Sequence, residues 1–398
     1  MQNTHLPFFP MENLNVIIIG AGMAGLAAGI ALQQAGYRVA IHERFTDVRP
    51  AGAAISLWPN GVKVLNRLGL GEKIAAIGGR METMGYRNGF TGEVLTHFSL
   101  EPLVRRVGER PYPVPRTALQ NMLMDALGRE HIHFGSTLTG IEEDAEGVTA
   151  FFENGTSARA DLIVAADGTH SILRNHVIGH PAERRYCGYV NWNGLVAASE
   201  DIAPAGAWVT HVGEGKRVST MPLADGQLYF FFDVPLEKGL PAEKGRAREE
   251  LAAHFSGWAA PVQRLIATLD PTTTTRLEIH DVAPLTRLAR GRVVLVGDSG
   301  HSTAPDLGQG GCQAMEGAWV LANCLKSHTL GIPDCLTRYQ DLRIERVAGL
   351  ITGARKRSNI THAMEPEKTA AWYEELKQED GSAIMDAIAR TILAGPLH

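Results

Sequence analysis

A strand, a glycine-rich turn and a helix follow one another near the start of the chain, and this combination restricts the fold more than any other feature. The β-branched run 15–19 leads into GAGMAG at residues 20–25, which matches G-x-G-x-x-G, and then into an uncharged Ala- and Leu-rich segment to Gln34. A second predicted strand runs from Tyr37 to Glu43. The pattern predicts a right-handed βαβ unit in a parallel sheet.

The turn has the composition of a site for a dinucleotide pyrophosphate. Gly20 permits a tight turn, Gly22 lets the backbone approach a phosphate, and Gly25 lets the helix pack against the strand. The amides at the start of the helix favour an anion. Glu43 is placed to accept a hydrogen bond from the adenosine ribose. The motif alone does not distinguish NAD from FAD.

Charge and composition exclude several partners. With 38 basic and 43 acidic residues the net charge is −5, which argues against nucleic acid. The apolar stretch 16–32 is broken by four glycines and no Lys or Arg precedes it, so we expect a buried strand and helix rather than a membrane span. The basic run 355–357 is expected to be a solvated helix face.

The cysteines and histidines do not form a metal-binding pattern. The four cysteines, at 187, 312, 324 and 335, contain no C-x-x-C, and His170, His176 and His180 lack a third ligand at convincing spacing. We expect no metal, and reduced thiols in the cytoplasm.

The style of the sequence changes twice along the chain. Residues 185–280 alternate β-rich runs with glycine-rich turns, which predicts an antiparallel sheet. The pattern of an α/β domain then returns, with a short apolar run at 293–296, a glycine-rich loop and an Ala-rich helix to Leu325. We expect a discontinuous cofactor domain over 12–184 and 286–334, with part of 80–112 on the substrate side. A β-rich substrate domain over 185–285 and a helical C-terminal segment over 335–398 complete the prediction.

Two later segments identify the cofactor. ADGTHSILR at 166–174 follows the apolar run 162–164, and GDSGH at 297–301 continues to GQGG at 308–311. With the first motif, they resemble the three motifs of the group A flavoprotein monooxygenases, the family of the para-hydroxybenzoate and salicylate hydroxylases. The resemblance implies bound FAD, NADH or NADPH as a transient co-substrate, and a Rossmann-like domain of the para-hydroxybenzoate hydroxylase type.

The same resemblance implies which residues hold FAD. Asp298 is the expected ribityl ligand, the loop 308–311 opens a helix towards the flavin ring, and Arg116 matches an arginine that touches the cofactor. Cys312 and Glu316 stand where Asn and Asp are frequent, so no side-chain role is assigned to either. The implied cofactor-binding residues are Gly20, Gly22, Ala24, Gly25, Glu43, Arg44, Ser56, Arg116, Leu138, Asp167, Asp298, Gly308, Gln309, Gly310, Gly311 and Cys312.

A closer resemblance concerns the substrate. The runs at 52–61, 188–194, 213–219 and 229–235 are similar to those of the bacterial FAD-dependent urate hydroxylases of purine breakdown. This implies hydroxylation of urate to 5-hydroxyisourate through a flavin hydroperoxide, with NAD(P)H and O2 consumed. The implied substrate-binding residues are Asn191, Arg217, Tyr229 and Phe231, and the implied catalytic residues are Arg217 and Tyr229.

The chemistry of these side chains suits the substrate. Urate is anionic near neutral pH, so the Arg217 guanidinium can hold its carbonyl edge, Tyr229 can orient the ring, and Asn191 offers a donor and an acceptor. Two alternatives stay open: a hydroxylase of a phenolic or pyridine carboxylic acid, and a flavin redox module that hydroxylates nothing. The choice between NADH and NADPH and the oligomeric state also stay open.

The hairpin that carries these residues poses a geometric problem. A two-residue turn at Asp225 and Gly226 would pair position 217 with 234 and place Arg217 and Tyr229 on opposite faces. Both are expected in one pocket, so we predict a bulge or a different register in this hairpin.

Overall fold

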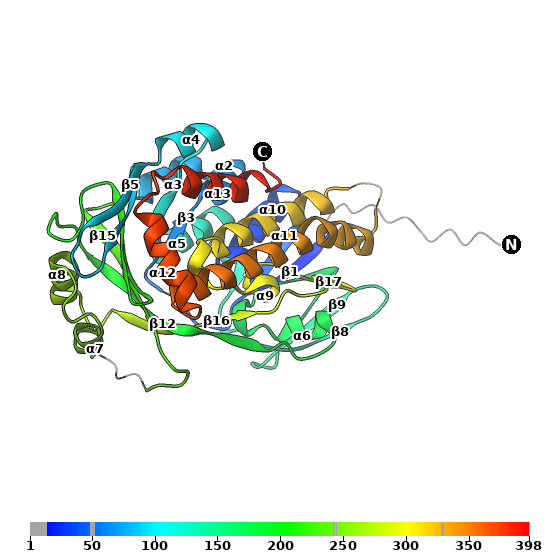
Figure 1. The fold of residues 1–398 in the computed structure, drawn as a ribbon. Coiled ribbons are helices and arrows are strands. Elements are labelled where there is room, and N and C mark those ends of the chain that lie inside the picture. Colours follow the sequence, from blue (N-terminus) through cyan, green and yellow to red (C-terminus); the bar gives the residue numbers. More distant parts are fainter. Residues whose placement is uncertain (1–13, 48–51, 242, 244, 328–329, 398) are drawn as a thin grey trace.

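The computed structural model describes residues 14–47, 52–241, 243, 245–327 and 330–397, so the expected start of the first domain at residue 12 lies outside the described residues (Figure 1). Within these ranges, no helix combines the length and apolar character needed to cross a bilayer.

A six-stranded sheet forms the frame of the cofactor domain. Its order is β17 (Ala289–Arg290), β18 (Val293–Leu295), β11 (Leu162–Ala165), β1 (Asn15–Ile19), β2 (Arg38–His42) and β7 (Ile132–His133). All neighbours are parallel except β17 and β18. The predicted βαβ unit is confirmed: β1 and α1 (Met23–Gln34) have the expected bounds, and the four apolar residues after Asn15 are buried.

Layers cover both faces of this sheet. One face packs against α1, α5 (Arg116–Leu127) and α10 (Gly310–Leu325), which share the largest apolar core. The other face packs against α6 (Ile172–Ile178) and a three-stranded sheet of β8 (Leu138–Glu143), β9 (Val148–Phe152) and β10 (Ser157–Ala160). The consecutive strands β10 and β11 belong to different sheets. They divide at Asp161, whose amide donates to the Asn15 carbonyl and whose carboxylate accepts from the Asn15 amide.

Short elements connect these layers. They are β3 (Ala54–Leu57), which pairs with β6 (Tyr112–Pro115), and α2 (Pro59–Arg67), α3 (Gly71–Ile77), α4 (Glu101–Val107), α9 (Asp298–His301), η1 (Arg129–His131), η2 (Gly168–His170) and η3 (Pro305–Leu307).

A seven-stranded sheet forms the other half of the molecule. Its order is β16 (Thr275–Val282), β12 (Arg184–Ala197), β15 (Gln227–Pro235), β14 (Lys216–Pro222), β13 (Ala207–Gly213), β4 (Thr83–Asn88) and β5 (Val94–Ser99). The antiparallel arrangement expected for 185–280 is confirmed, because all strand pairs within this block are antiparallel. β4 enters from the N-terminal part of the chain and pairs with β13 in parallel. Two helices that the sequence analysis missed, α7 (Ala247–His254) and α8 (Ala260–Thr268), bury their apolar residues against this sheet.

The C-terminal segment is helical, as expected: α11 (Ile332–Thr361), α12 (Pro366–Leu376) and α13 (Ser382–Leu393). In Figure 1 these orange and red helices run from the cofactor domain across to α2 and α4. The basic run on α11 is not the solvated face that was expected. Arg355 pairs with the buried Asp281, and Arg357 lies over the Trp372 ring at 4.2 Å, because α11 packs against β16 and α12; only Lys356 is exposed.

Candidate active site

Three motifs that are far apart in sequence meet at one edge of the parallel sheet. Gly20, Asp167 and Asp298 follow the neighbouring strands β1, β11 and β18, and carboxyl ends of parallel strands share an edge. Arg174 joins two of the motifs: its Nη2 donates to the Asp298 carbonyl at 2.6 Å and its Nη1 to the Thr169 carbonyl at 3.1 Å. This edge is the ligand-binding position of open α/β folds.

The first turn has no room for side chains at two of its glycines. Gly20 has a φ of +105°, and a Cβ there would lie 2.4 Å from the Ala166 carbonyl oxygen. A Cβ on Gly25 would lie 1.9 Å from the Gly20 oxygen, whereas Gly22 faces open space. Glu43 accepts hydrogen bonds from the Ala21 amide at 2.8 Å and the Phe45 amide at 3.0 Å. The turn is closed on the protein side and open at the helix N-terminus, as a pyrophosphate requires.

The polar groups around this edge fit FAD. Four atoms, Ser56 Oγ, Trp58 Nε1, Arg116 Nε and Asp167 Oδ1, are buried with no hydrogen-bond partner among the described residues. Each such atom costs about 1–3 kcal/mol unless a ligand satisfies it. Burial raises the pKa values of Asp167 and Asp298 and lowers that of Arg116. When bound, FAD would supply the polar and anionic groups that these side chains lack.

The loop before α10 approaches the same edge. Gly308 has a φ of +63°, and a Cβ there would lie 2.6 Å from Trp58 Nε1; a Cβ on Gly311 would lie 2.5 Å from Ile55. Gly310 opens α10, so the positive end of that helix faces this loop. Cys312 is fully buried, its Sγ accepts from the Trp58 amide at 3.3 Å, and burial raises its pKa to about 12.

Three implied cofactor residues have contacts within the protein. Ala24 is buried where a Cβ on Gly297 would meet it, at 2.5 Å. Leu138 belongs to the apolar core beneath the parallel sheet, and the Arg44 guanidinium lies 4.7 Å from the centre of the Phe45 ring.

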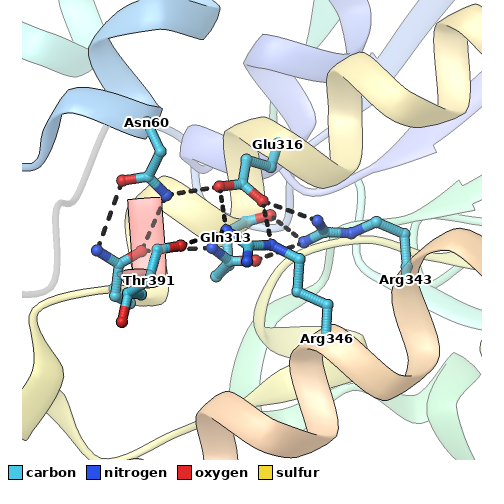
Figure 2. A network of polar contacts seen from close by, with 7 residues as sticks. Asn60, Gln313, Glu316, Arg343, Arg346 and Thr391 are labelled. Carbon is cyan, nitrogen blue, oxygen red and sulfur yellow. Dashed lines mark hydrogen bonds and ion pairs between the residues drawn. The ribbon is translucent and has the colours of Figure 1, made fainter. Parts of the chain in front are cut away.

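The side chain of Gln309 belongs to a buried polar network rather than to an open surface. Its Oε1 accepts from Asn60 Nδ2 at 2.9 Å, and the same Asn60 amide donates to Glu316 (Figure 2). Glu316 accepts from Arg343 at 2.9 Å and from Arg346 at 2.7 Å. The network ties the start of α10 to α2 and α11, and Arg346 extends it to the Thr391 carbonyl of α13.

All four implied substrate residues lie on one face of the seven-stranded sheet. Arg217 is paired with Asp233 rather than with residue 234, because the hairpin loop has three residues, with Asp225 and Gly226 at positive φ. The predicted change of register is confirmed. Asn191 is also opposite Asp233, and Phe231 and Tyr229 follow at the two-residue spacing of that face.

Arg217 is held by two carboxylates. Its Nε donates to Asp233 at 2.7 Å, and its Nη2 lies 3.3 Å from Asp306, which comes from η3 in the loop 305–311 before α10. Both aspartate side chains are fully buried, and Arg217 is 13 % exposed. Although burial lowers the pKa of Arg217, Asp233 and Asp306 outweigh it and raise that pKa; burial raises the pKa of Asp306, but Arg217 and His362 lower it to about 2. The guanidinium lies 5.2 Å from the centre of the Phe231 ring.

Asn191 and Tyr229 differ in how freely they can meet a ligand. Asn191 Nδ2 donates to Asp233 at 2.7 Å and its Oδ1 accepts from Asn193 at 2.8 Å, so its amide is largely engaged. Tyr229 is half-buried, and its hydroxyl makes no hydrogen bond to any residue that the structure describes. Burial raises its pKa to about 12, so the phenol is a proton donor at neutral pH.

Four members of this cluster were not predicted from the sequence: Asp233, Asp306, Tyr189 and His362. Asp233 and Tyr189 stand inside the quoted runs 229–235 and 188–194, and Asp306 lies between the quoted segments 297–301 and 308–311. Strand alternation, which places Asp233 on the face of Tyr229 and Phe231, was a usable signal for Asp233. Tyr189 donates to Asp306 at 2.7 Å and His362 lies against Tyr189. His362 follows α11, and its sequence surroundings carry no sign of the sheet that it meets.

Comparisons with known proteins show the family to which the chain belongs. Residues 13–354 match a family model described as an FAD binding domain. The FAD-dependent urate hydroxylase of Klebsiella pneumoniae is 51 % identical over 96 % of this chain and 100 % of its own length. The FAD-dependent urate hydroxylase of Mycolicibacterium vanbaalenii is 50 % identical over 96 % of this chain and 98 % of its own length.

Solved structures show the same fold. Klebsiella pneumoniae HpxO, complexed with FAD and uric acid, superimposes with a TM-score of 0.94 at 50 % identity, covering 97 % of this chain and 98 % of that one. A salicylate hydroxylase substrate complex shares the fold at a TM-score of 0.77 and 23 % identity, over 97 % and 100 % of the two chains. The chain therefore belongs to the FAD-binding flavoprotein monooxygenases, in the same family as the FAD-dependent urate hydroxylases.

Proposed function

We propose that this protein hydroxylates urate at C5, converting urate, O2, NAD(P)H and a proton into 5-hydroxyisourate, water and NAD(P)+. The observation that carries the proposal is the cluster of side chains on one face of the seven-stranded sheet, the substrate face. Arg217, Tyr229 and Phe231 lie together there, and Asp306 connects Arg217 to the loop 305–311, which we expect to face the flavin. The urate hydroxylase relatives align over nearly the whole chain, which includes this face.

The roles of the side chains follow from their contacts. Bound FAD supplies the oxygen-activating chemistry. Arg217 is fixed on one side by Asp233 and Asp306 and presents its remaining N–H groups to the carbonyl edge of urate. Phe231 provides an apolar face beneath the guanidinium, and the Tyr229 hydroxyl donates to the ring. Asn191 acts through Asp233, whose orientation it fixes.

The cofactor contacts are proposed from the same geometry. The turn at Gly20 to Gly25 holds the pyrophosphate, and Asp298 and Arg116 bind the ribityl and flavin portions. Since the sequence contains only one G-x-G-x-x-G, NAD(P)H docks at the surface rather than in a domain of its own. The four free, buried cysteines suit a reducing compartment such as the cytoplasm.

An aerobic assay of the purified yellow protein tests the proposal. Urate should accelerate NADH or NADPH consumption and yield 5-hydroxyisourate in a ratio near one to one with little hydrogen peroxide. 4-Hydroxybenzoate and a pyridine carboxylate serve as comparison substrates. Faster turnover with either comparison compound would show that urate is not the preferred substrate. Formation of hydrogen peroxide without hydroxylated product would indicate a flavin redox module.

A further inference from the structure

A buried histidine of the C-terminal segment completes the cluster around Arg217. His362 directly follows α11 and is fully buried. Its ring stacks on Tyr189 with centroids 3.8 Å apart, its Nδ1 lies 3.2 Å from the Gly215 carbonyl oxygen, and its Nε2 lies 3.3 Å from Asp306 Oδ1. One side chain therefore touches β12, the turn between β13 and β14, and the loop 305–311.

The backbone around His362 is shaped for this contact. Ala363 has a φ of 54°, Gly215 has a φ of 71°, and a Cβ on Gly215 would lie 2.7 Å from the Ala363 Cβ. The hydroxyl of Tyr373 on α12 accepts from the Gly215 amide at 3.1 Å. The turn between β13 and β14 is thus held closely against the C-terminal helices, two residues before Arg217.

Both nitrogens of the His362 ring face oxygen atoms that can only accept. A neutral imidazole carries one N–H and cannot donate to both a carbonyl and a carboxylate, whereas an imidazolium can. The Nε2 contact has the distance of an ion pair without the alignment of a hydrogen bond, so it favours the cation through charge. The face of Tyr189 also favours a cation.

Other groups near the ring act in both directions. Burial disfavours the cation, and so does Arg217, on the far side of Asp306. Tyr373 contacts the same turn, where its hydroxyl accepts from the Gly215 amide. Asp306 is the one carboxylate at ion-pair distance from His362 among the described residues.

The charge balance gives the histidine a consequence for substrate binding. Arg217 contributes one positive charge, and Asp233 and Asp306 contribute two negative ones. With a neutral histidine the cluster would be negative and would repel anionic urate, whereas an imidazolium makes it neutral. We propose that His362 is a positioning residue held as an imidazolium, which balances Asp306 and leaves Arg217 free to receive the anionic substrate. This inference rests on the proposed function.

A charge-balance cycle in the FAD-loaded protein tests the proposal. His362→Gln makes the cluster negative, Asp306→Asn with His362 intact makes it positive, and the double variant is neutral again. Urate dissociation constants are measured without turnover, from the change in flavin absorbance at pH 7. For His362→Gln we expect the dissociation constant of urate to rise about ten-fold. This follows from the Coulomb energy of one lost positive charge at an effective dielectric constant of roughly 20. The double variant should return to within about three-fold of the wild type, because neutrality is restored.

If the losses of urate affinity in the two single variants add up in the double variant, His362 does not act through its charge and has only a packing role. FAD content and thermal unfolding of each variant identify any that fail to fold. The wild type also provides a readout that needs no variant: ¹⁵N NMR of histidine-labelled holoenzyme at pH 7, with His362→Gln used only to assign the resonance. Two protonated ring nitrogens support the proposal, and a neutral ring overturns it. If the wild type does not bind urate, the proposed function fails, yet the NMR result still decides the charge of His362.

Discussion

At the residue scale, the sheet face that carries Arg217 and Tyr229 has two kinds of side chain. Some form hydrogen bonds with one another, and others are free to bind a ligand. Arg217, Asp233 and Asn191 form a continuous chain of charge-assisted hydrogen bonds, which fixes the guanidinium without using all of its donors. The Tyr229 hydroxyl is not used in any such contact among the described residues. Loss of a held group should therefore affect folding and binding together, whereas loss of the free hydroxyl should affect binding alone.

Tyr229→Phe tests this distinction. The variant keeps the ring against Phe231 and loses only the hydroxyl, so the free energy of unfolding should change by less than about 0.5 kcal/mol. The KM for urate should rise about three- to ten-fold, the value of one hydrogen bond. Tyr86→Phe, on the same sheet against Trp372, is the matched control and should leave KM unchanged. An unchanged KM in Tyr229→Phe would remove the hydroxyl from the substrate site.

At the scale of elements, local patterns predicted those parts whose structure depends on near neighbours. β1, the glycine turn and α1 have the predicted bounds, because β-branched residues, positive φ and helix propensity act locally. α7 and α8 were missed in a block read as β-rich. Part of 80–112 was expected on the substrate side, but the parallel pairing of β4 with β13 was not predicted, because it joins residues far apart in sequence. The partners of Arg217 could be predicted only in part, since Asp306 and His362 arrive from distant elements.

The Gly25 contact gives a prediction about the first turn. Gly25→Ala would place a Cβ 1.9 Å from the Gly20 carbonyl oxygen, so strand and helix must separate and the turn must open. The purified variant should hold much less FAD, read from the ratio of flavin to protein absorbance. Gly349→Ala, on exposed α11 with no atom near the added methyl, is the control and should keep its FAD while gaining up to about 1 kcal/mol of stability. Full FAD content in Gly25→Ala would exclude this turn from the cofactor site.

The network around Glu316 gives a second prediction at this scale (Figure 2). Glu316→Ala would leave the buried Arg343, 1 % exposed, without its carboxylate, and should lower the free energy of unfolding by about 3–5 kcal/mol. Burial raises the pKa of Glu316, but Arg346 and Arg343 outweigh it and lower that pKa. Because the pKa of Glu316 is lower in the folded than in the unfolded chain, its carboxylate stabilises the folded protein at pH values above the unfolded pKa. The difference in free energy of unfolding between the wild type and Glu316→Ala should therefore narrow below about pH 4.

Urea unfolding of the holoenzyme at pH 7 and at about pH 3, below the unfolded pKa of a glutamate, measures both effects of Glu316→Ala. Glu345→Ala, exposed on α11, is the control and should change stability by less than about 0.5 kcal/mol. Equal stabilities of Glu316→Ala and Glu345→Ala would show that the network does not hold α10 in place.

At the scale of the whole molecule, the cofactor edge and the substrate face depend on each other through elements that contact both. The loop at 305–311 lies at the parallel sheet and also supplies Asp306 to Arg217, and the C-terminal helices contact both halves. The adenine half of FAD is expected at the Gly20 turn and the flavin half at this loop. Binding of FAD should therefore stabilise the folded chain as a unit, rather than one half of it.

Removal and return of FAD test this coupling. A ligand that binds only the folded state, present at 100 times its dissociation constant, adds about 2.7 kcal/mol, which is roughly 3 °C in Tm for a chain of 398 residues. The apoprotein should therefore unfold in one transition whose midpoint rises with added FAD. FMN lacks the ADP half and cannot use the turn at Gly20, so at the same concentration it should give a clearly smaller rise. An equal rise with FMN would show that the Gly20 turn contributes no binding energy, and a second transition indifferent to FAD would show that the two halves fold independently.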